Sequence, residues 1–135
     1  MRVEVVSAEA EIFSGEATML IATAEAGDVG IYPQHTPMLT RLKAGDVRLQ
    51  KEDGSEDVIY VSGGILEVTP KVVTVLSDTA IRADDIDEAQ ALKAKEKAEQ
   101  ALKDNKADMN YAKAKAELAQ AAAQLQALKK IKKIR

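Results

Sequence analysis

The 135-residue sequence contains no cysteine and a single histidine, His35. Neither a disulfide framework nor a thiolate metal site is therefore available, and a metal centre would have to rely on carboxylates. Neither a Gly-x-Ser-x-Gly elbow nor a Walker A loop occurs, and the carboxylates are scattered as on a solvated surface. We expect no catalytic residue, no metal site and no resident cofactor in this chain.

Long apolar runs are also missing. No window approaches the roughly 18 uninterrupted apolar residues that a membrane-spanning helix needs. Met1-Arg2 leads straight into an alternating segment, without a basic stretch followed by an apolar one, so we expect no signal peptide. If the protein works at a membrane, we expect another protein to hold it there, without direct membrane insertion.

Glycine and proline occur only in the first part of the chain, and this part has the pattern of β structure. Short apolar or alternating runs recur with no helical segment between them, and Asp53-Gly54 is a strong hairpin signal. Such spacing predicts an antiparallel β-sandwich or barrel. The expected strands cover residues 3–6, 19–21, 47–50, 58–61, 65–68 and, as the last strand, 72–76.

The last fifty residues have helix composition, with fourteen alanines and neither proline nor glycine. Asp85 followed by Glu88 has the spacing of a capping box, which predicts a first helix to about Lys103. Residues 104–106 form a polar connector, and Asp108 is the expected cap of a second helix. The fold class is therefore α+β, with a sandwich in residues 1–84 and an antiparallel helical hairpin in residues 85–135.

Each predicted helix carries an alanine-rich stripe on one face. A buried alanine methyl contributes about 0.8 kcal/mol, against about 1.5–3 kcal/mol for a leucine or isoleucine, so such a face docks weakly. Both an ordinary fixed hairpin and one that changes partners fit this composition. The stripe residues are Ile86, Ala91, Ala94, Ala98, Ala101 and Leu102 in the first helix, and Tyr111, Ala114, Leu118, Ala121, Leu125 and Leu128 in the second.

The sign of the net charge changes at the same point as the composition, near residue 85. Residues 1–85 carry 7 Lys/Arg and 15 Asp/Glu, whereas residues 86–135 carry 12 and 7. The segment 129–135 alone holds five cations, more than the helix dipole needs, which suggests an acidic partner. Nucleic acid fits poorly because the body is acidic and the helices lack aromatics apart from Tyr111, and the apolar face is small for a membrane surface.

The segment 27–37 contains two glycines and two prolines, which restrict its backbone to a shaped loop. A loop of this kind on a β scaffold often presents a binding surface, and a structural turn between strands fits equally well.

Three stretches of the sequence resemble the epsilon-subunit family of bacterial F-type ATP synthases. Their order, their spacing and the two-helix C-terminus agree with the family, over roughly residues 3–135. The stretches are residues 5–9 with Phe13-Ser14-Gly15, residues 27–40, and residues 60–68 followed by 72–80.

The resemblance implies a β-sandwich of about ten strands that binds the gamma subunit and the membrane rotor ring of c subunits. Asp28 stands where the family usually has glutamate, at a position that faces the rotor ring. Ser7, His35 and Thr40 match positions that lie against gamma. The location implied is the cytoplasmic face of the bacterial plasma (inner) membrane.

The helical hairpin is the regulatory part of this family, so the resemblance implies a movable hairpin. Folded down on the sandwich it leaves the enzyme free, and extended it meets the alpha and beta subunits and stops ATP hydrolysis. The candidate contacts with an acidic segment of beta are Lys113, Lys115, Lys129, Lys130, Lys132 and Lys133.

Some family members also bind ATP in the folded-down hairpin, through a motif of which Ile86, Asp87 and Ala91 are present here. Gln90 replaces the arginine of that motif, and a neutral amide makes no charge-assisted bond to phosphate. We expect weak or absent ATP binding. The function implied is a non-catalytic rotor subunit that couples proton flow to ATP synthesis and inhibits hydrolysis; the alternative is an ATP-sensing regulatory module.

Overall fold

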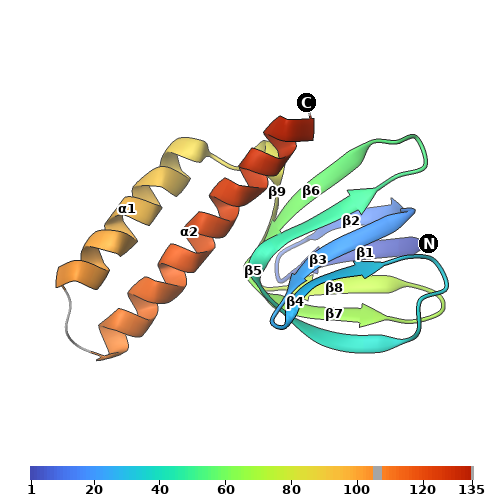
Figure 1. Ribbon diagram of the computed structural model, residues 1–135, viewed down its shortest axis with the longest axis horizontal. Helices are drawn as coiled ribbons and strands as arrows, with labels where there is room; N and C mark the ends of the chain where they lie inside the picture. Colours follow the sequence, from blue (N-terminus) through green and yellow to red (C-terminus); the bar gives the residue numbers. More distant parts are fainter. Residues whose placement is uncertain (105–107, 135) are drawn as a thin grey trace.

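The computed structural model describes the backbone of residues 1–104 and 108–134, and the side chains of residues 1–103 and 111–132. Within these ranges it contains nine strands, one 3₁₀ turn and two α-helices (Figure 1). The elements are β1 (Arg2–Ser7), β2 (Glu11–Glu16), β3 (Met19–Ala24), β4 (Gly27–Ile31), β5 (Met38–Gln50), β6 (Glu56–Val61), β7 (Gly64–Val68), β8 (Val73–Ser77), β9 (Ala80–Arg82), η1 (Ala83–Asp85), α1 (Glu88–Asp104) and α2 (Asp108–Ile134).

The strands form one hydrogen-bonded network in the order β2-β1-β8-β7-β5-β3-β4, with β6 joining β5 to β9. Strand β5 connects the layers of the sandwich, because its residues 38–42 pair with β7 whereas 45–50 pair with β6. The core between the layers is built from inward-facing residues such as Leu20, Leu49 and Leu66, none of which is exposed. These alternate with outward residues along each strand, as the period of two requires.

Several sequence-based expectations need correction. Strand β1 runs parallel to β8, so the sandwich is not wholly antiparallel. The nine strands of the described residues agree with the expected number of about ten, but β9 follows the strand that was expected to be the last. The segment 27–37 is not all loop, because Gly27–Ile31 forms β4 and pairs with β3. A turn is left at residues 32–37, where Gln34 adopts a φ of 68°.

The expected cap of the first helix also lies elsewhere. Asp85 belongs to η1, and α1 begins only at Glu88. The Oδ1 atom of Asp87 accepts a hydrogen bond from the backbone N–H of Gln90 at 3.2 Å, which makes Asp87 the N-cap. Helix α2 begins at Asp108 as expected, although the side chain of this residue lies outside those described.

The glycine pair before β7 is required by its surroundings. Gly64 has a φ of +143°, and a Cβ atom on it would lie 1.9 Å from the carbonyl oxygen of Leu76. Only a residue without a side chain fits this approach of β7 to β8. The segment Ser62-Gly63-Gly64 is therefore structural, and it brings β7 and β8 close enough to share one outer face.

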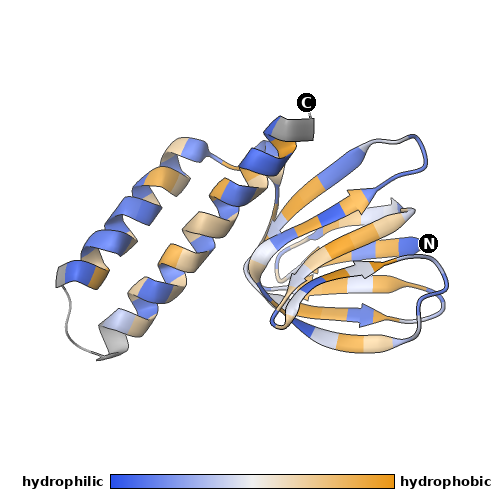
Figure 2. Cartoon of the chain, in the orientation of Figure 1, coloured by the Kyte–Doolittle hydropathy of each residue, from blue (hydrophilic) through white to orange (hydrophobic). Residues whose placement is uncertain are grey.

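The two helices lie side by side on one flank of the sandwich (Figure 1). Helix α2 packs on β5, β6 and η1, and α1 packs on α2. Ala91 and Ala98 of α1 and Ala114 and Ala121 of α2 are buried, as the predicted stripes required. Tyr111 and Ala94 of the same stripes are exposed, so these two positions lie outside the buried contact between the helices. Figure 2 shows that hydrophilic residues predominate along α1.

Candidate functional site: the docked hairpin and the outer face of the sheet

Helix α2 covers a patch on the outer face of β6. Strand β6 is buried on both faces, because Ile59 and Val61 point into the sandwich whereas Val58 and Tyr60 point towards α2. The helix meets this patch with Ala123, Ala127 and Ile131, which were not in the predicted stripe. From the helix side, burying two alanines and one isoleucine contributes about 3–5 kcal/mol, and Val58, Tyr60 and Ala83 add the burial of the sandwich side.

Two polar contacts accompany this apolar patch. Asp46 of β5 and Tyr60 of β6 are direct cross-strand partners, so both lie beneath the helix. The Nζ atom of Lys130 lies 2.8 Å from each carboxylate oxygen of Asp46, whose exposed fraction is only 6%. Tyr60 is 1% exposed; burial raises the pKa of its phenol, and a hydrogen bond with Gln124 lowers it in part.

The lysines that the sequence singled out have different surroundings. Lys113, Lys115 and Lys129 are exposed. Lys132 lies 3.1 Å from Glu88 at the start of α1, in an exposed ion pair, and Lys130 is the one that reaches the sandwich. The side chain of Lys133 lies outside the described residues. Exposed lysines near both ends of α2 are therefore available to an acidic surface, with Lys130 already partnered.

The three residues expected to contact gamma are not gathered in one place. Ser7 Oγ closes the turn after β1, where it accepts hydrogen bonds from the backbone N–H groups of Glu9 and Ala10. Thr40 pairs with Leu66 and therefore lies on the side of β5 that faces the core. Ser7 therefore stabilises a turn, and Thr40 lies on the core side of its strand.

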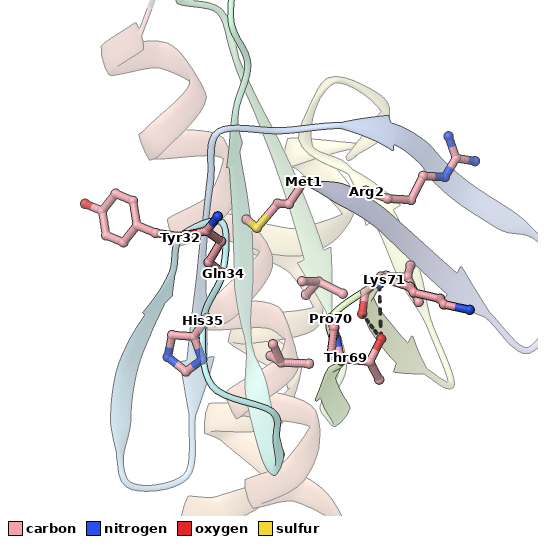
Figure 3. A pocket seen from close by; sticks show the side chains of 11 residues that line it. Met1, Arg2, Tyr32, Gln34, His35, Thr69, Pro70 and Lys71 are labelled. Atoms are coloured by element: carbon pink, nitrogen blue, oxygen red, sulfur yellow. Dashed lines mark hydrogen bonds between the residues drawn. The ribbon is translucent and has the colours of Figure 1, made fainter.

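His35 precedes β5, away from the bend at Ala44 and Asp46 where α2 packs on this strand. It lines a small pocket of about 60 Å³ with Met1, Tyr32 and Thr69, and its Nδ1 atom is 2.7 Å from the carbonyl oxygen of Thr36 (Figure 3). A space of this size is far below that of a typical ligand pocket. His35 therefore has the surroundings of a residue at a protein surface, half-buried against a shaped turn.

The sequence reasoning missed an exposed apolar face on β5, β7 and β8, whose large apolar side chains alternate with Arg41 and Glu67. Ile65 and Leu76 are direct cross-strand partners and are 41% and 50% exposed, and Leu39 on the neighbouring strand is 67% exposed. An open groove next to them is lined by Ser7, Gly63 and Asp78 among others. The signal was in the sequence, because Ile65 and Leu76 have the opposite parity to the buried Leu66 and Val75.

Asp28 lies at the start of β4, exposed and opposite Thr23 of β3. It lines an open cleft between the sandwich and α2, together with Asp46, Ala119 and Lys130. The contact with the rotor ring that the sequence suggested would thus be made beside the docked helix, from a carboxylate that solvent reaches.

The residues of the degenerate ATP motif have structural roles. Ile86 packs beside the patch under α2, Asp87 caps α1, and Ala91 is buried between the helices. A separate cleft of about 290 Å³ lies between the helices, at the lower limit for a ligand pocket. Its lining residues are Glu88, Leu92, Lys95, Ala122, Leu125, Gln126 and Lys129.

Within the parts of the chain that the structure describes, no three His, Cys, Asp or Glu side chains gather closely enough to hold a metal ion. Over the same residues, no helix has both the length and the apolar character needed to cross a bilayer. What the geometry defines is a binding module: a rigid sandwich with an apolar outer face, and a basic hairpin docked through a small contact.

Comparison with known proteins identifies the family. Residues 1–83 match the beta-sandwich domain of the ATP synthase delta/epsilon chain, and residues 84–129 match its long alpha-helix domain. The ATP synthase epsilon chain of Nitrosococcus oceani is 62% identical over 133 residues, which is 98% of this chain and 95% of the relative. That of Nitrosospira multiformis is 54% identical over 97% of this chain and 94% of the relative. The chain therefore belongs to the ATP synthase delta/epsilon family.

Solved structures agree on the fold. A chain in the mitochondrial ATP synthase of Euglena gracilis, in an assembly of OSCP, F1 and c-ring, superposes with a TM-score of 0.84 at 20% identity, over 93% of this chain and 79% of that one. A chain in the central stalk and c-ring of the Tetrahymena thermophila enzyme gives a TM-score of 0.65 at 13% identity, over 95% and 96%. At these identities the likeness concerns the fold alone.

Proposed function

We propose that this chain is a non-catalytic rotor subunit in the central stalk of an F-type ATP synthase. It couples proton flow to ATP synthesis through the sandwich and restrains ATP hydrolysis through the helical hairpin. Membership of the family supports the first part. The second part rests mainly on one observation, that a basic hairpin docks on the sandwich with two alanines, one isoleucine and an ion pair, and contributes nothing to the core between the sheet layers.

Each proposed partner is assigned to a different surface of the molecule. The gamma subunit covers the apolar face of Leu39, Ile65 and Leu76, with contributions from Ser7 and His35, whereas Thr40 supports this contact from the core side of β5. Asp28 contacts the membrane rotor ring of c subunits. The exposed lysines of α2 meet the alpha and beta subunits when the hairpin extends. The protein is then peripheral, held on the cytoplasmic face of the bacterial inner membrane by the rest of the enzyme.

Deleting residues 86–135 from the assembled enzyme tests the restraint. The core between the sheet layers contains no residue from this segment, so the sandwich keeps its main apolar interior. We expect the enzyme to hydrolyse ATP faster while still pumping protons. Unchanged hydrolysis would contradict the restraint, and lost proton pumping would show that the hairpin is needed for coupling.

The alternative is a hairpin that senses ATP. The cleft between α1 and α2 favours it to a degree, because Lys95 and Lys129 line its walls. Calorimetry on the isolated chain and on Gln90→Arg separates the two functions. We expect no micromolar binding of ATP by the natural chain. Gln90 is not among the residues that line the cleft, so a gain of affinity in Gln90→Arg would indicate a nucleotide site at the start of α1 outside the cleft.

A further inference from the structure

The ion pair between Asp46 and Lys130 joins the two parts of the molecule. Asp46 lies on the outer face of β5 and is almost fully buried, whereas the side chain of Lys130 is 34% exposed. Both distances from Nζ to the carboxylate oxygens are 2.8 Å. A carboxylate with so little access to water needs a charged partner at close range, and the docked helix supplies it.

The sandwich holds Asp46 ready for this contact. Strand β3 has an irregularity between Ala22 and Ala24, which leaves Thr23 free to approach the bend of β5. The Oγ1 atom of Thr23 lies 3.2 Å from Oδ1 of Asp46. Gly45 makes the approach possible, because a Cβ atom there would lie 2.6 Å from the Cβ atom of Thr23. With the helix docked, the sheet thus holds the carboxylate at its contact with Lys130.

We propose that Asp46 is an internal competitor for Lys130, and that it determines how readily the hairpin leaves the sandwich. One ammonium group cannot pair with Asp46 and with an acidic partner surface at the same time. The ion pair of Lys132 with Glu88 has no such effect, because both residues belong to the hairpin and move with it. The competition with a partner rests on the proposed function, whereas the effect on docking does not.

Thiol labelling measures the docking in the isolated chain. The natural sequence has no cysteine, so Ala127→Cys introduces one thiol at a position that is 0% exposed beneath the helix. A thiol reagent reaches it only when the hairpin leaves, and the labelling rate is then proportional to the undocked fraction. A separate chain with Val61→Cys in the sandwich core reports unfolding of the whole domain.

In this background, Lys130→Gln leaves Asp46 buried without its charge partner, and we expect labelling to be about 10- to 100-fold faster. Asp46→Asn leaves a lysine that still reaches water, so its effect is smaller. The matched control is Lys129→Gln, which removes the same charge from the adjacent exposed residue and changes the rate by less than about twofold. Labelling at Val61→Cys stays unchanged in all three.

If Lys130→Gln labels no faster than Lys129→Gln, the proposal is wrong. It is also wrong if the two effects at Asp46 and Lys130 add in the double variant, since paired groups must couple. In the assembled enzyme, Asp46→Asn is expected to lower ATP hydrolysis, because Lys130 is set free for the partner. Lys130→Gln is expected to lower it less or to raise it, because the released hairpin has lost that contact.

The outcomes distinguish the effect of Asp46 on docking from its competition with a partner. In one case the labelling effects of Asp46 and Lys130 are coupled, but neither these variants nor deletion of residues 86–135 changes ATP hydrolysis. This result would overturn the restraint of hydrolysis and the competition for Lys130, and would leave the role of Asp46 in docking unaffected. Equal changes in hydrolysis for Asp46→Asn and Lys130→Gln overturn the competition alone.

Discussion

Tyr60 shows how a single side chain depends on the position of the hairpin. It is among the largest fully buried side chains, and its phenol lies beneath α2 beside Asp46. Burial raises the pKa of the phenol because the ionised form would lose its hydration, and the hydrogen bond with Gln124 opposes this in part. When the hairpin leaves, the phenol regains water and its pKa returns towards the ordinary value of about 10.

Docking is therefore expected to weaken in alkaline solution. The neutral phenol is favoured in the docked state, so its contribution is fully present below pH about 10 and is lost as the pH rises through the raised pKa. Tyrosinate absorbance of the natural chain minus that of Tyr60→Phe isolates this group. We expect a midpoint above 10, and a return towards 10 when residues 86–135 are deleted. A midpoint at or below 10 in the full chain would contradict the prediction.

For the ion pair beneath α2, the sequence indicated the basic residue but not its acidic partner. Lys130 was recognised as a cation in excess of what the helix end needs. Asp46, which it contacts, lies 84 residues away, and no local pattern connects the two. Asp46 looks like one more charge in an alternating strand, because its burial is created by a helix that arrives from the other end of the chain.

The start of helix α1 depends on a single N-cap residue, Asp87. The helix makes its main contacts with α2 alone, so its first turn depends on local hydrogen bonding. Asp87→Ala is expected to destabilise the start of the helix by about 1 kcal/mol, whereas Asp87→Ser keeps an acceptor and changes it little. Hydrogen exchange of the amides of residues 90–92 measures this, with an acceleration of about fivefold. Equal exchange in the alanine and serine variants would show that the carboxylate caps nothing.

The sequence predicted some elements well and others poorly, for physical reasons. The run of residues 58–61 correctly predicted the strand β6, and its uninterrupted apolar character fits the burial that the structure shows on both faces. Strand β4 was taken for loop because its two glycines mask the alternation, and β9 has only three residues, too few to show a period. The parallel pairing of β1 with β8 leaves no trace, since alternation is the same in both directions.

At the scale of the whole molecule, the two proposed activities occupy separate surfaces. The hairpin docks on β5 and β6, whereas the exposed apolar residues Ile65 and Leu76 lie on β7 and β8. The acidic part of the chain carries the apolar face, and the basic part is the hairpin. Changes on one surface should therefore leave the other intact, because the groups share no contacts.

Leu76→Glu tests this separation. A glutamate at the centre of the apolar face places a charge where a partner must exclude water, so binding to the isolated gamma subunit is expected to weaken by about 30-fold or more. Leu92→Glu is the matched control, since Leu92 on α1 is 45% exposed, close to the 50% of Leu76. We expect Leu92→Glu to bind gamma normally, and Leu76→Glu to keep the slow thiol labelling of a docked hairpin. Equal binding by both variants would move the gamma contact away from β7 and β8, and faster labelling in Leu76→Glu would show that the two surfaces are coupled through the sheet.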